Sequence, residues 1–158
     1  MLHDTLIAVH AATGTASLLT GVVVVARHRL FALYLWSLVI SIVTLTAAVA
    51  LAWRGRPAAT NLLFAGLVVL GAAMVRSGVL ARPLRPDPSG PASQRFLDLV
   101  GFTLISLFDG FVIVAVLTRG GPAWLALVAA TAGVIVGRAA MHQVADQPAP
   151  ADRPGALP

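Results

Sequence analysis

Five long apolar runs dominate this sequence and limit the folds open to it. Each run approaches or exceeds the ~20 residues that an α-helix needs to cross the hydrocarbon of a bilayer. The runs are too long for β-strands, and they lack the alternation of apolar and polar residues that a half-buried strand shows. The sequence therefore predicts an all-α bundle of five membrane-spanning helices, at Thr5–Ala26, Leu30–Trp53, Ala59–Leu80, Phe96–Thr118 and Ala123–Met141.

The composition agrees with a membrane protein and excludes several kinds of site. The chain is 58% hydrophobic and 11% charged, whereas soluble domains have about 25% charged residues. It contains no cysteine, which excludes disulfides, thiol catalysis, iron–sulfur ligation and cysteine-type zinc sites. No segment resembles a Walker A loop, a Gly-x-Ser-x-Gly elbow or a His-Glu-x-x-His helix. We therefore predict no catalytic site and no metal site.

Two segments interrupt or follow the helical pattern. Residues 82–95 contain four prolines, which fix φ and remove backbone donors, so this segment is predicted to be an extended loop. The tail at 146–158 is rich in proline and alanine, has no periodicity and is predicted to be disordered. The remaining chain, residues 1–145, is predicted to form a single transmembrane domain.

The distribution of arginine predicts the orientation. The chain has more basic than acidic residues, and its arginines lie between the apolar spans. We therefore interpret the arginines as determinants of membrane topology. The expected partner is the lipid bilayer, and no nucleic acid is expected. Eight arginines on one side against three on the other predict an N-terminus outside and a C-terminus in the cytoplasm, in a bacterial cytoplasmic (inner) membrane. The eight are Arg27, Arg29, Arg76, Arg82, Arg85, Arg95, Arg138 and Arg153, and the three are Arg54, Arg56 and Arg119.

Asp109 is the strongest candidate for a functional residue. It lies near the middle of the fourth span, where an ionisable side chain costs ~2.5–3.5 kcal/mol on insertion scales and normally has a partner inside the protein. The directions in which side chains lean favour Arg76 or Arg138 as its ion-pair partner, with His10 third. Asp109 either only fixes the helix register or takes part in proton or substrate movement. One face of its helix carries Asp98, Phe102, Ser106, Asp109 and Ile113.

Two further patterns predict helix packing. Polar and small residues recur on one face of the first helix and of the second, so both faces are expected to point inward. Ala129, Gly133 and Gly137 form a small-xxx-small face on the fifth helix, which permits close approach of another helix. That helix belongs either to this chain or to another copy or membrane protein. The inward residues are His3, His10, Gly14, Ser17, Gly21 and His28, and Tyr34, Ser37, Ser41, Thr44 and Ala48.

The histidines raise the alternative of a bound haem b. A haem needs an axial histidine at membrane depth, commonly opposed by a second one. His10 has no other deep histidine to oppose it, whereas His28 and His142 both lie at the predicted inner face and could meet there. A protein without cofactor is the simpler interpretation.

Part of the sequence resembles a known family. The residues that carry the resemblance are the segment His10–Gly14, then Gly21, the Arg27–Arg29 segment and Tyr34. They are similar to a bacterial family of predicted multi-pass membrane proteins of unknown function, the domain-of-unknown-function 2306 type. The resemblance covers roughly the first four spans. It implies a helical membrane bundle and a role for His10 and His28, but no activity.

These features together predict a non-enzymatic inner-membrane protein. It is expected to be a small transporter-like unit or an accessory subunit, with Asp109 as a buried polar centre. Two alternatives stay open: a haem-binding membrane electron carrier, and a purely structural subunit of a larger complex.

Overall fold

The computed structural model describes residues 1–55, 58–86 and 92–145, and every regular element among them is helical. The predicted all-α class is therefore confirmed. Five α-helices cover the five apolar runs, and short 3-10 turns extend three of the connections. The helices are α1 (Leu2–Ala26), α2 (Phe31–Leu51), α3 (Ala58–Ala81), α4 (Gln94–Thr118) and α5 (Ala123–Ala145), and the turns are η1 (His28–Leu30), η2 (Trp53–Gly55) and η3 (Arg82–Leu84).

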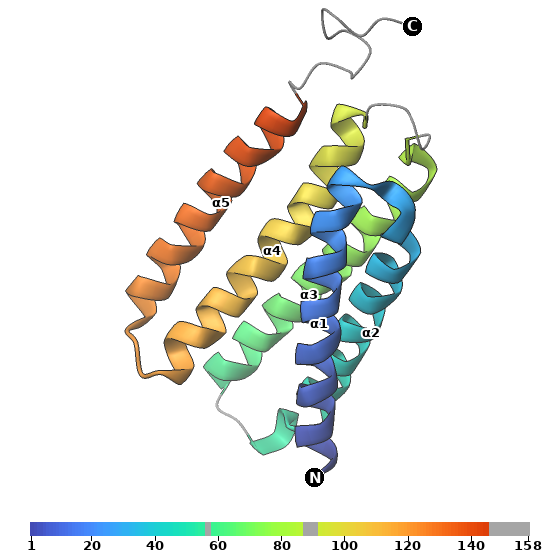
Figure 1. Ribbon diagram of the computed structural model, residues 1–158. Helices are drawn as coiled ribbons and strands as arrows, with labels where there is room; N and C mark the ends of the chain where they lie inside the picture. The colour runs from blue at the N-terminus through green and yellow to red at the C-terminus, as the bar shows by residue number, and fades with distance from the viewer. Residues whose placement is uncertain (56–57, 87–91, 146–158) are drawn as a thin grey trace, which may run out of the picture.

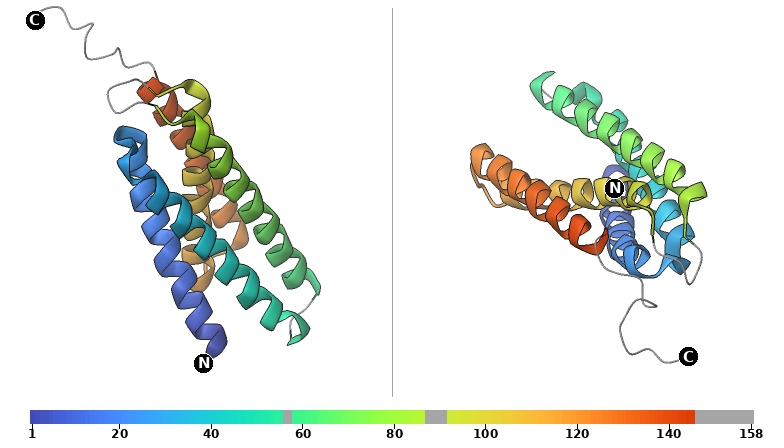
Figure 2. Two further views of the ribbon diagram at one scale, coloured as in Figure 1. Left: turned by 90° about the vertical axis from the view of Figure 1, so that its right-hand side faces the viewer. Right: turned by 90° about the horizontal axis from the view of Figure 1, so that it is seen from above.

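Helices α1 to α4 form a bundle, and α5 lies against its outer side (Figure 1, Figure 2). Each of the first four helices packs against the next, and α4 closes the ring by packing against α1. The main partner of α5 is α4. As a result α4 contacts α1, α3 and α5, so it is the element around which the rest of the chain is arranged.

An aromatic cluster fills one end of the bundle, where α2 and α4 begin. The ring centroid of Phe31 lies 5.7 Å from that of Tyr34 and 6.1 Å from that of Phe96, and all three side chains are buried. The guanidinium carbon of Arg85 lies 5.5 Å from the centroid of Phe31, within the range of a cation–π contact. This contact attaches Arg85, which follows α3 and η3, to the aromatic core.

Hydrogen bonds between helices link α1, α2 and α4 inside the bundle. His10 Nδ1 lies 2.9 Å from the backbone oxygen of Ser41 and 2.9 Å from its Oγ. The Ser17 hydroxyl donates to the backbone oxygen of Tyr34 at 3.3 Å, and the Tyr34 hydroxyl is hydrogen-bonded to Thr103 on α4. Because these groups face each other, the two predicted polar stripes meet inside the bundle.

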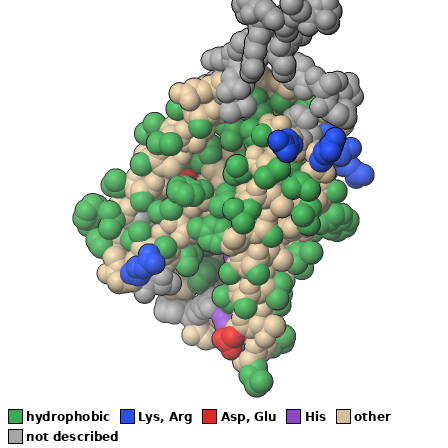
Figure 3. All heavy atoms as spheres, in the orientation of Figure 1, with side chains coloured by type: hydrophobic (Ala, Val, Ile, Leu, Met, Phe, Trp, Pro, Cys, Tyr) green, Lys and Arg blue, Asp and Glu red, His purple; other side chains and the backbone are tan. Residues whose placement is uncertain are grey.

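The outer surface is that of a membrane protein. Four helices are long and apolar enough to cross a bilayer, at Leu2–Ala26, Phe31–Leu51, Thr60–Leu84 and Gln94–Val116, and the described part of α5 adds a shorter apolar stretch at Val128–Met141. Hydrophobic side chains spread over the flank of the bundle, and arginine side chains gather toward its ends (Figure 3). Apolar surface of this extent is suited to lipid and would be an aggregation hazard in water.

Candidate functional site

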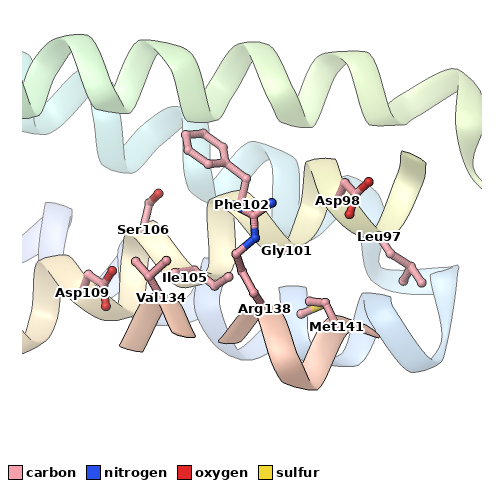
Figure 4. Close-up of a pocket in the computed structure, with 10 residues that line it drawn as sticks. All are labelled: Leu97, Asp98, Gly101, Phe102, Ile105, Ser106, Asp109, Val134, Arg138 and Met141. Carbon is pink, nitrogen blue, oxygen red and sulfur yellow. The ribbon is translucent and has the colours of Figure 1, made fainter. Parts of the chain in front are cut away.

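A cavity of about 320 Å³ lies between α4 and α5 (Figure 4). Its polar side chains are Asp98, Ser106 and Asp109 from α4 and Arg138 from α5. The α4 members follow from helical periodicity, since residues three, four, seven or eleven apart lie on one face. Of the face predicted from the sequence, Asp98, Phe102, Ser106 and Asp109 line the cavity and Ile113 does not. The other lining residues are Leu97, Gly101, Ile105, Val134 and Met141.

Asp109 is buried in the wall of this cavity, with 9% of its surface exposed. Its Oδ1 atom has no hydrogen-bond partner. Gly133 on α5 gives this oxygen its place, because a Cβ atom at that position would overlap Oδ1. An unsatisfied buried polar atom costs about 1–3 kcal/mol, so this carboxyl group lowers the stability of the fold that holds it.

Of the three predicted partners of Asp109, the structure brings only Arg138 to the cavity. Arg138 extends from α5 toward α4 at the level of Gly101 and Phe102 (Figure 4). In the described part of the chain, however, the one ion pair is that of the Met1 amino group with Asp4, so Arg138 lies more than 4.0 Å from the carboxylate of Asp109.

The other two proposed partners have different surroundings. Arg76 is exposed on α3 and does not line the cavity. His10 is engaged with Ser41 on α2. The expectation that Arg76 or His10 pairs with Asp109 is therefore not met by the described side chains, because α3 turns Arg76 outward and α2 supplies the partner of His10.

Glycines hold α4 and α5 close together at this site. A Cβ on Gly137 would lie 2.5 Å from Cγ1 of Ile105, and a Cβ on Gly101 would lie 2.9 Å from Cγ of Met141. Together with the contact of Gly133 and Asp109, three contacts join the two antiparallel helices. On each helix, successive contacts are four residues apart. The close packing predicted for Gly133 and Gly137 thus falls within this chain, against α4. The sequence analysis did not predict that Gly133 leaves space for the carboxyl group of Asp109. The matching four-residue spacing on the two helices could have indicated it.

A second groove lies beside the cavity and is almost entirely apolar. Residues of α1, α4 and α5 line it, among them Leu18, Val22, Phe108 and Ala129. Ala129, predicted to belong to the small-residue face of α5, lines this groove together with Gly133 and Gly137. The polar cavity is thus bordered on one side by apolar surface.

Of the three histidines considered as haem ligands, His10 is the one whose side chain the structure describes. The side chains of His28 and His142 lie outside the described residues, so their predicted meeting stays a prediction. No group of three or more metal-ligating side chains is found among the residues searched, which are the described ones. A Soret band in the absorption spectrum of the purified protein would test the haem alternative directly.

Comparison of the chain with known protein families, with curated proteins and with solved structures found no match.

Proposed function

We propose that this chain is a small transporter-like unit of the bacterial cytoplasmic membrane, with five spans and with Asp109 as its polar centre. The observation that carries the proposal is the buried, unpartnered Oδ1 atom of Asp109 in a cavity shared with Ser106 and Arg138. An ionisable side chain inside a membrane domain is costly, and such residues typically mark paths for ions, protons or substrates. A purely structural group would have gained a partner.

Two groups of the cavity support a role in proton exchange. Burial favours the neutral form of a carboxyl group, and a nearby cation favours the ionised form. Arg138 supplies such a cation on the facing helix. Since α5 packs mainly against α4, a small movement of α5 would change the distance between the two groups and with it the proton occupancy of Asp109.

The proposed topology has the N-terminus outside and the C-terminus in the cytoplasm. Arg27, Arg29, Arg82, Arg85 and Arg95 lie at or beside helix ends, at the end of the bundle away from the N-terminus. Reporter fusions after Arg85 and after Arg153 should both report the cytoplasm, and a fusion after Arg54 should report the periplasm. A periplasmic signal from either of the first two fusions would overturn this orientation.

Proton flux tests the transporter-like function. The purified chain is reconstituted into liposomes that contain a pH-sensitive dye, the membrane potential is clamped with potassium and valinomycin, and the outside is acidified. We expect faster proton entry than in protein-free liposomes, because Asp109 provides a binding site at mid-membrane. Equal rates would contradict a transporter-like unit.

An accessory subunit is the second candidate, favoured by the exposure of α5. Large apolar side chains on this helix face outward, among them Leu125, Val128, Ile135 and Val136. If a partner subunit covers this face, the protein should run as a larger complex when it is extracted gently from its native membrane. Substitution of Ile135 by a charged residue should then release it, whereas a free unit should run alone in both cases.

A further inference from the structure

Two opposite charges face the same cavity without contacting each other. Asp109 has an unpartnered oxygen atom, and Arg138 forms no ion pair with any described carboxylate. The other carboxylate of the cavity is already engaged, since the Gln94 amide donates to Asp98 Oδ1 at 3.0 Å. Asp109 is buried, and a charge removed from water is stabilised only when it gains a partner, whereas Arg138 is an exposed residue of α5 at the edge of the cavity. The site is therefore incomplete as the chain alone builds it.

We propose that the cavity binds a small zwitterion. This proposal rests on the transporter-like function proposed above. The ammonium group of the zwitterion pairs with the carboxylate of Asp109, and its carboxylate pairs with the guanidinium of Arg138. A guanidinium group matches a carboxylate through two parallel hydrogen bonds, and an ammonium group offers three donors to a carboxylate. One ligand that carries both charges pairs with Asp109 and with Arg138 at the same time.

Ligands with a single charge fit this cavity less well. The lining carries the carboxyl groups of Asp98 and Asp109 and the guanidinium of Arg138, so a simple anion would be repelled by the first two and a simple cation by the third. The cavity wall between the two charged groups is apolar, with Ile105 and Val134 among its members. This wall suits a short aliphatic chain between the ammonium and the carboxylate.

The size and depth of the cavity narrow the ligand further. A cavity of about 320 Å³ accommodates a small molecule. α4 runs from Gln94 to Thr118, so Asp109 lies about 22 Å along the helix from its first residue. From Thr118, the last residue of α4, the distance is about 14 Å, so Asp109 lies within the hydrocarbon and away from the lipid headgroups of both surfaces. The ligand is therefore a free small molecule of the ω-amino acid type.

Thermal unfolding and titration calorimetry in detergent test this assignment. The probes are β-alanine, 4-aminobutanoate and 6-aminohexanoate, with butylamine and butanoate as matched single-charge controls. We expect at least one zwitterion to bind and to raise the unfolding temperature, while both controls at the same concentration leave it unchanged. Binding by butylamine alone as tight as by the zwitterion, or binding by no zwitterion, would overturn the assignment.

Variants locate the binding groups. Asp109→Asn and Arg138→Gln should each weaken zwitterion binding by roughly 30-fold or more, since each strands one charge of the ligand. Arg138→Lys, which keeps the charge and loses the planar pair of donors, should bind with intermediate affinity. Arg76→Gln is the matched control, because Arg76 does not line the cavity, and it should bind as the parent does. Unweakened binding by folded Arg138→Gln would contradict the assignment.

The outcome is separable from that of the proton-flux experiment, which contains no zwitterion. Flux that depends on Asp109 together with no zwitterion binding would remove only this ligand class. Zwitterion binding without any flux would remove the transporter-like function and leave a binding subunit.

Discussion

Replacing Asp109 by asparagine should abolish the proton flux of the reconstituted protein and leave its fold intact. Asparagine has nearly the shape of aspartate, but its amide does not take up or release a proton at the pH of the flux experiment. Breaking a buried ion pair would cost about 3–5 kcal/mol. No such pair is present among the described residues, and Oδ1 has no partner to lose. We therefore expect an unfolding temperature in detergent at least as high as that of the parent.

Asp4→Asn is the matched control for this experiment. Asp4 is a carboxylate on the exposed first turn of α1, paired with the N-terminal amino group at 2.8 Å. Its replacement should leave the proton flux unchanged. Unchanged flux in Asp109→Asn would contradict the assignment of the polar centre. A strongly destabilised Asp109→Asn that Arg138→Gln restores would instead show that the two residues form a structural ion pair.

Gly133→Leu and Gly137→Leu should each destabilise the bundle strongly. Gly137 packs against Ile105, and Gly133 packs against the carboxyl group of Asp109. Inserting a large side chain into a close contact costs typically 1–3 kcal/mol, and here the bulk also forces α5 away from α4. Gly133→Leu should additionally remove the proton flux, because its side chain displaces Asp109. Thermal unfolding in detergent and flux in liposomes measure the two effects.

Gly66→Leu provides the control for these two variants. Gly66 lies within α3, and a Cβ atom there would meet nothing within 4 Å among the described atoms. The same change in side-chain volume in a helix should therefore cost little or nothing. Gly55→Leu, at an open position in η2, should behave in the same way. Equal losses at all four positions would remove the packing assignment.

The helices and the face that carries the site could be predicted from the sequence because both follow from local periodicity. Length and hydropathy determine where a membrane helix begins and ends. The eleven-residue step from Asp98 to Asp109 is three turns, so both residues share one face of α4 whatever packs against it.

Which arginine shares a cavity with Asp109 could not be predicted, because it depends on how each helix is rotated in the bundle. Arg76 and Arg138 have equivalent positions in the sequence, each inside a span that runs in the same direction. In the structure α3 directs Arg76 outward, whereas the contacts of Gly133 and Gly137 turn Arg138 toward α4. The rotation results from many small packing terms across the interface, and no single residue type encodes it.

The hydrogen bonds of the core show the same limit. Tyr34 and Thr103 are 69 residues apart in the chain, and no local pattern pairs them. The polar stripes on α1 and α2 indicated which faces point inward, but not that His10 binds Ser41. Sequence periodicity thus identifies the buried faces, and tertiary packing selects the partners.

Labelling of single cysteines tests most directly whether the cavity around Asp109 is a hydrated site inside the membrane. The chain has no cysteine of its own, so a cysteine introduced at Ser106, in the cavity wall, is its only thiol. Ile135→Cys is the control, because Ile135 is 65% exposed on α5 and faces lipid in the proposed arrangement. A maleimide reacts with the thiolate, which forms in water and not in hydrocarbon.

We therefore expect a water-soluble, membrane-impermeant maleimide to label Ser106→Cys in membrane vesicles and to leave Ile135→Cys unlabelled. Addition of Gly133→Leu to the Ser106→Cys chain should slow the labelling, since it disturbs the cavity. If Ser106→Cys resists the reagent from both sides of the membrane as Ile135→Cys does, Asp109 does not lie in a hydrated cavity and the proposed polar centre is contradicted.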